Sequence, residues 1–139
     1  MTKTFNIDLW QTIKKELTGQ DEALNGRIFF GLAPEDTPTP YCVVHVLDSG
    51  EDNDAQTLCQ NNADYQTVGS ARIQFTIYAP NDMWLDEIRE DLNKTIKSLQ
   101  DLKEYRILSK VLLRSKNASS FSNEVGIGLT EFRFGYEPL

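Results

Sequence analysis

His45 is the residue type best suited to acid–base chemistry, and the chain contains it once. A serine or cysteine nucleophile would need this histidine as its base, within hydrogen-bond reach. Cys42, three positions earlier in an expected strand, points to the opposite strand face. The sequence also has no nucleophile-elbow pattern. We therefore interpret His45 as a packed or interface histidine, and we expect no catalytic residue and no enzyme activity.

An acidic run after position 47 suggests a second kind of chemistry, calcium binding. It contains Asp48, Glu51, Asp52 and Asp54. A calcium loop of the EF-hand type needs an Asp-x-Asp-x-Asp-Gly order and a glutamate at its twelfth position, and both are missing. We interpret the run as a solvated acidic loop and expect no bound metal and no other cofactor.

Two further patterns have structural interpretations. Gly126 and Gly128 lack the third glycine of a phosphate-binding loop and open an expected strand, where glycine relieves crowding or allows a bulge. Trp10 and Trp84 lie on expected amphipathic helices without the basic neighbours that nucleic-acid stacking requires. Core packing is therefore the expected role of both tryptophans.

The acidic charge is concentrated in one part of the chain. The formal net charge of −7 comes from 21 acidic and 14 basic residues, and no Lys or Arg occurs from Ile28 to Ala71. The acidic residues of that segment are Glu35, Asp36, Asp48, Glu51, Asp52, Asp54 and Asp64. One surface is therefore expected to carry the excess charge. Such a surface repels DNA, because nonspecific nucleic-acid binding depends on clustered Lys and Arg.

A length of 139 residues fits one domain, here 1–139. The chain has no signal-peptide pattern and no apolar run long enough to span a membrane, so we expect a soluble protein made in the cytosol. Cys42 and Cys59 are the only cysteines. We expect both to be free thiols, because two cysteines do not make a disulfide framework and cytosolic thiols stay reduced.

Helical spacing of apolar residues predicts two helices. The first spans about Asp8 to Thr18 and is stopped by Gly19. The second starts near Asp82, after a capping segment, and extends to about Leu99. Its apolar stripe consists of Leu85, Ile88, Leu92, Ile96 and Leu99.

Five segments have strand character. They are Arg27–Phe30, Tyr41–Leu47, Ala71–Ala79, Arg106–Lys116 and Val125–Tyr136. The resulting order α-β-β-β-α-β-β contains no repeated β-α-β unit. It predicts an α+β domain in which a mostly antiparallel sheet of four to five strands packs against two helices.

The second of these strands, Tyr41–Leu47, is apolar on both faces. It must lie inside the sheet, or a second subunit must cover one face. Pro34, Pro38 and Pro40 precede it and prevent regular pairing of the segment that they occupy. A long acidic loop is expected at about 48–69, and the part from 48 to 64 is expected to be mobile until a neighbour orders it.

The order of several motifs resembles one phage family. A short N-terminal helix, GRIFFGLAP (26–34), PTPYCVV (38–44) and ARIQFTIYAP (71–80) before an amphipathic helix together resemble the tail-completion, or tail-terminator, proteins of long-tailed bacteriophages. The resemblance covers about Ile7 to Leu99. It implies a structural virion protein of the neck, assembled in the host cytoplasm, that forms a ring, commonly a hexamer.

The resemblance also implies partners. They are further copies of the chain, the major tail-tube protein and a head-completion or stopper protein, with DNA passing through the lumen without specific binding and no membrane contact. The interface candidates are Val44, Val46, Asp48, Glu51, Asp52 and Asp54. Two alternatives remain open: another neck component, such as a head–tail adaptor or stopper, and a small ligand-binding α+β domain.

Overall fold

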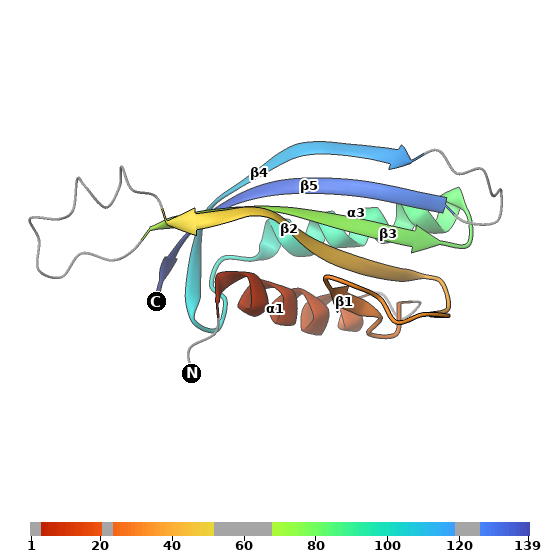
Figure 1. The fold of residues 1–139 in the computed structure, drawn as a ribbon, viewed down its shortest axis with the longest axis horizontal. Coiled ribbons are helices and arrows are strands. Elements are labelled where there is room, and N and C mark those ends of the chain that lie inside the picture. The colour runs from red at the N-terminus through yellow and green to blue at the C-terminus, as the bar shows by residue number, and fades with distance from the viewer. Residues whose placement is uncertain (1–3, 21–23, 52–67, 119–125) are drawn as a thin grey trace, which may run out of the picture.

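The computed structural model describes residues 4–20, 24–51, 68–118 and 126–139. Within these ranges the chain forms two helices and five strands, and the predicted α+β class is confirmed (Figure 1). The elements are α1 (Phe5–Gln20), β1 (Ile28–Phe30), β2 (Tyr41–Glu51), β3 (Gly69–Ala79), α3 (Asp82–Ser98), β4 (Tyr105–Ala118) and β5 (Gly126–Pro138).

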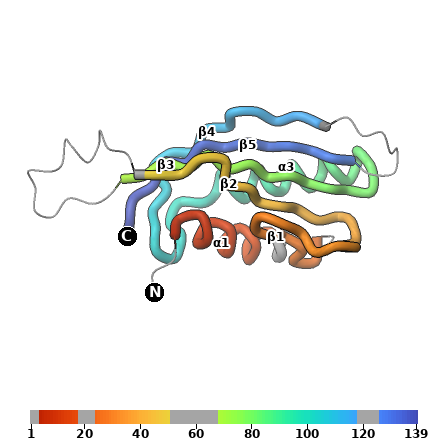
Figure 2. Tube along the Cα trace, viewed as in Figure 1, coloured from red at the N-terminus to blue at the C-terminus, as the bar shows by residue number. Residues whose placement is uncertain are grey.

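The strands form one sheet in the order β1-β2-β3-β5-β4, which the tube in Figure 2 shows side by side. β2, β3, β5 and β4 pair antiparallel with their neighbours, and only β1 runs parallel to β2. β2 therefore lies inside the sheet where β1 covers it, from Cys42 to Val44. The apolar character of β2 is therefore explained by its position inside the sheet, which is the first of the two possibilities that the sequence left open.

Both helices pack on one face of the sheet and share its hydrophobic core. On β3 the alternate residues Ile73, Phe75 and Ile77 are fully buried, as the period-two pattern predicts. The predicted stripe of α3 is buried against them, and Asn81 caps this helix by accepting a hydrogen bond from the Trp84 backbone N–H at 3.0 Å. β3 and α3 therefore agree closely with the strand and the helix that the sequence predicts.

The structure corrects the ends of two elements. α1 begins at Phe5, whose ring stacks on that of Tyr136 with centroids 3.9 Å apart, and it continues one residue beyond Gly19. β2 extends to Glu51, so Asp48 and Glu51 lie in a strand and not in a loop. They pair opposite β3 after a bulge, because backbone pairing to an existing strand does not depend on apolar side chains.

Side chains of α1 hold this helix to two other parts of the chain. The buried Asp8 carboxylate accepts hydrogen bonds from the backbone N–H groups of Glu104 at 2.8 Å and Lys103 at 3.3 Å. The indole Nε1–H of Trp10 donates to the carbonyl of Ile28 at 2.9 Å. α1 is thus attached both to β1 and to the segment that leads into β4.

Candidate assembly surface

β4 is an edge strand and is exposed along most of its length. Four of its apolar side chains keep a third to a half of their surface in contact with solvent: Leu108 (50%), Val111 (49%), Leu112 (50%) and Leu113 (36%). Clusters of exposed apolar residues are uncommon on monomeric proteins and usually mark an interaction surface. This apolar cluster is the core of the candidate assembly surface.

The register explains why β4 exposes apolar residues in several directions. Leu112 pairs opposite Phe132 and Val111 opposite Arg133, so these neighbours point to opposite faces of the sheet. Register shifts between Ile107 and Ser109 and between Leu112 and Arg114 insert Leu108 and Leu113 as extra residues. A bulge bends and twists a strand locally, so the edge presents leucines over a broad surface.

β4 is also basic, with Arg106, Lys110, Arg114 and Lys116 and no acidic residue. The Arg114 guanidinium lies 3.6 Å from the carboxylate of Glu131, a mostly buried residue of β5. The Lys110 ammonium donates to the carbonyls of Lys97 and Leu99 at 2.7 and 2.6 Å, and burial lowers the pKa of this lysine. Lys110 therefore joins β4 to the end of α3.

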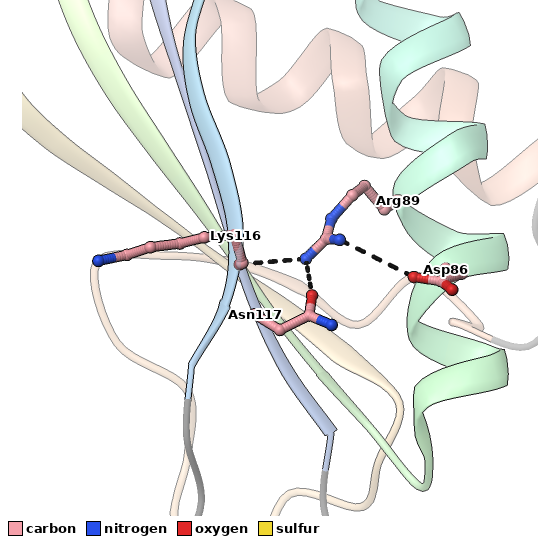
Figure 3. A network of polar contacts seen from close by, with 4 residues as sticks. All are labelled: Asp86, Arg89, Lys116 and Asn117. Atoms are coloured by element: carbon pink, nitrogen blue, oxygen red, sulfur yellow. Dashed lines mark hydrogen bonds and ion pairs between the residues drawn. The ribbon is translucent and has the colours of Figure 1, made fainter.

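The far end of β4 is held by Arg89 of α3 (Figure 3). Its guanidinium donates to the Lys116 carbonyl at 3.2 Å and to the side-chain oxygen of Asn117 at 2.6 Å, and it lies 3.8 Å from the carboxylate of Asp86. The position of Gly128 makes this contact possible, because a Cβ atom there would overlap the Arg89 guanidinium. The expectation that this glycine relieves crowding is confirmed.

The opposite edge of the sheet, formed by β1, β2 and the segment between them, carries acidic instead of basic residues. We call it the β1–β2 side, residues 28–51. It also exposes apolar side chains, namely Phe30 (38%), Leu32 (83%) and Leu47 (41%). It contains Glu35, Asp36, Asp48 and Glu51 but no Lys or Arg. Both edges of the sheet therefore expose apolar side chains, but β4 carries basic residues and the β1–β2 side carries acidic ones.

The interface residues proposed from the sequence take different positions on this side. Val44 is fully buried in the core, so its side chain is not accessible to a second subunit in this structure. Val46 is half-buried on the same, helix-facing side, and Asp48 is exposed. Glu51 is the last residue of β2 and pairs opposite Gly69. Asp52 and Asp54, like the rest of 52–67, lie outside the described residues.

The other face of β2 is largely covered within the subunit. Val43 is only 4% exposed, and the Tyr41 and Tyr78 rings stack beside it with centroids 4.6 Å apart. A small pocket of about 180 Å³ at this point is lined in part by His45 and Leu32. From Cys42 to Val44 both faces of β2 are therefore covered by packing within the subunit, whereas Leu47 of the same strand remains exposed.

Among the described residues, the thiol of Cys42 and the imidazole of His45 do not lie together. Cys42 faces the core, while His45 lies on the opposite face of β2, as the sequence predicted. Burial raises the pKa of the Cys42 thiol to about 12, so it is not a thiolate near neutral pH. Among the described residues no group of three His, Cys, Asp or Glu side chains is placed to hold a metal ion. Cys59 lies outside the described residues.

A larger hollow lies between α1 and the segment that follows α3. Its volume is about 470 Å³, and its lining is mostly polar or charged, including Asp8, Gln11, Lys15 and Lys103. A site for a small organic ligand normally has an apolar lining with a few converging polar groups. The lining of this hollow is instead mostly polar, so it does not resemble such a site.

None of the helices in the described parts of the chain is long and apolar enough to cross a membrane.

The sequence interpretation missed the exposed leucines of β4. Their signal was present, because Val111, Leu112 and Leu113 are consecutive and Leu108 precedes them, which breaks the alternation of a half-buried strand. Consecutive apolar residues predict burial on both faces when the strand is central. They predict an interaction surface when the strand lies at an edge, and the position of the strand in the sheet decides between the two.

Comparison with known proteins gives a fold relationship. No protein-family model and no curated protein sequence matches the chain. Among solved structures, 33 chains match. One of them is described as "Virion of native gene transfer agent (GTA) particle"; it has a TM-score of 0.55 and 12% sequence identity, over 91% of this chain and 96% of that chain. At this identity the likeness establishes a shared fold over nearly the whole length of both chains.

Proposed function

We propose that the chain is a structural component of a phage-like virion, and that it assembles into a ring which caps the tail tube and joins the tail to the head. The observation that carries this proposal is the fold likeness to a chain of a gene transfer agent virion, over 91% of the chain. The order of motifs that resembles tail-terminator proteins supports it independently, because that resemblance comes from the residues alone.

The candidate assembly surface supports the same proposal. A ring protein must expose contact surfaces on two sides of each subunit, because the contacts between neighbours in a ring are heterologous. β4 and the β1–β2 side lie at opposite edges of one sheet and both expose apolar side chains, and we propose them as these contact surfaces. We propose six subunits, the usual number in the family that the sequence resembles.

The charge distribution supports a role in which DNA passes without being held. The acidic segment between Ile28 and Ala71 lacks any base that could bind a phosphate. In the proposed ring, acidic residues of the segment that lie outside the subunit contacts line the opening, where they repel DNA and let it slide. The partners are then the tail-tube protein on one side and a head-completion protein on the other.

The test is assembly in the presence of the partner. Purified protein is examined by light scattering and negative-stain electron microscopy, alone and with tail tubes that lack a terminator. The proposal expects rings of 15.8 kDa subunits and a cap at one end of each tube. A protein that stays monomeric at high concentration and leaves tube ends uncapped would refute it.

A second candidate is another component of the same neck, an adaptor or stopper. It is favoured by the description of the matching structure, which specifies a virion particle and not a position within it. The same experiment separates the two candidates when portal-bearing heads are added in parallel. Binding to heads without binding to tail tubes would favour the adaptor or stopper.

A further inference from the structure

We infer that β4 of one subunit packs against the β1–β2 side of the next, so that the sheets of neighbouring subunits lie edge to edge around the assembly. This inference rests on the proposed ring and specifies its subunit contact. The occupant of the exposed β4 edge is then a second copy of this chain, contacted through a different surface from β4 itself.

The distribution of exposed apolar side chains favours this contact. Among the described residues, ten large apolar side chains are exposed, and seven of them lie on these two edges: Phe30, Leu32 and Leu47 on the β1–β2 side, and Leu108, Val111, Leu112 and Leu113 on β4. In an isolated subunit all seven side chains are exposed to water. Placing one edge on the other reduces the apolar area that both edges expose to solvent.

The charges of the two edges also favour this contact. β4 contains four basic residues and no acidic one, although Arg106 and Arg114 also form ion pairs with acids of their own subunit, whereas the β1–β2 side contains four acidic residues and no basic one. Contact between two β4 edges would bring like charges together, and so would contact between two β1–β2 sides. Contact between unlike edges pairs opposite charges, which favours the correct partner and disfavours the two-fold symmetric alternatives.

The exposed part of β4 and the uncovered part of β2 also match in length and lie at the same level of the sheet. β1 covers β2 only from Cys42 to Val44, so no described strand pairs with the outer edge of β2 from His45 to Glu51. Across the sheet, His45 is level with Arg114, and Glu51 is level with Ile107. The four exposed apolar residues of β4 all fall between these two levels. A neighbour placed without a shift along the strands would therefore meet them with its uncovered half of β2.

Strand direction agrees with this arrangement. β4 runs antiparallel to β5, β5 to β3 and β3 to β2, so β4 runs antiparallel to β2 of its own subunit. A neighbour in the same orientation continues the antiparallel order across the contact. The bulges and lysines of β4 disfavour indiscriminate pairing of this edge with other sheets. Side-chain complementarity is then what selects the partner.

The test uses two variants that each disable one edge. The β4 variant is Val111→Glu with Leu112→Glu, and the β1–β2 variant is Leu47→Lys with Asp48→Lys. Each change lies at an exposed position and brings charges of the same sign into the proposed contact. A control, Met83→Glu with Glu87→Lys, changes exposed residues of α3 away from both edges. Far-UV circular dichroism and thermal melts verify that all three proteins fold.

The expected result is that each edge variant alone loses self-association by roughly 30-fold or more, as for other interface anchors. The control assembles like the wild type. A mixture of the two edge variants forms complexes again, because the intact β4 of one protein meets the intact β1–β2 side of the other. Analytical ultracentrifugation of the separate and mixed proteins measures this recovery.

Other outcomes overturn the inference in distinguishable ways. If the wild type forms rings and the β1–β2 variant still assembles like it, the contact does not use that side, although the proposed function stands. If both variants fail and their mixture also fails, the two edges do not meet each other. A wild-type protein that never self-associates, even on tail tubes, would refute the ring itself.

Discussion

Replacing Asp8 with alanine removes a polar contact that joins two distant parts of the chain. The Asp8 side chain is 1% exposed, and its two carboxylate oxygens accept from the backbone N–H groups of Glu104 and Lys103 at 2.8 and 3.3 Å. These residues are more than 90 positions away in the sequence. The carboxylate thus fixes the segment before β4 onto α1, and alanine leaves both donors without this partner.

The size of the effect follows from the two distances. A hydrogen bond to a charged group contributes about 1.5–3 kcal/mol. The short bond to Glu104 belongs in that range, and the longer one to Lys103 adds less. Asp8→Ala should therefore lower the free energy of unfolding by about 3 kcal/mol. For a domain of this length such a loss lowers the melting temperature by roughly 10 °C.

Urea unfolding followed by tryptophan fluorescence and thermal melts by circular dichroism measure this loss. Glu16→Ala is the matched control, because Glu16 is an exposed acid on the same helix. It should stay within about 0.5 kcal/mol of the wild type. Asp8→Asn should fall between the two, since its amide keeps one acceptor oxygen. An Asp8→Ala protein as stable as the control would show that the carboxylate does not hold this segment.

Three further results are expected. Gly128→Ala should lower the free energy of unfolding by about 1–3 kcal/mol in urea melts, because its Cβ displaces a guanidinium from β4, whereas Gly50→Ala, with open space around it, should be tolerated. Val44→Asp should lose several kcal/mol or fail to fold, by circular dichroism, because it buries an unpaired charge in the core. In a Cys59→Ser protein, the Cys42 thiol should react with a thiol reagent only after unfolding. Because folding raises its pKa from 9.0 to about 12, its contribution to stability should be intact below pH 9 and lost as the pH rises toward 12.

The elements with a strong local pattern could be predicted from the sequence. β3 alternates between core and outer positions, with Thr76 as a buried residue of the outer face, and α3 has both a capping asparagine and a regular apolar stripe. In each case the residues that define the element are neighbours in sequence or within two helical turns. Local spacing therefore determines both the type of element and the face that it buries.

Features that depend on distant partners could not be predicted. The extension of β2 to Glu51 is visible only once Gly69–Arg72 of β3 lies beside it. The parallel pairing of β1 with β2 likewise follows from the path of the chain around 31–40. The role of Leu112 depends on β4 lying at an edge, which only the full strand order shows. The sequence led to interface candidates on β2, of which Val44 belongs to the core.

The pairing of Glu51 with Gly69 has a consequence for the evolution of this protein. The two residues lie opposite each other on neighbouring strands, so the connection 52–67 leaves and rejoins the sheet at adjacent points. A closed loop of this kind gains or loses residues at a small entropic cost, because closure entropy grows only with the logarithm of loop length. The pairing of Glu51 with Gly69 therefore sets no narrow limit on the length of this connection. Because a two-residue turn is long enough to bridge such a pair, we expect the sheet to fold after a deletion or the insertion of a foreign peptide at this position.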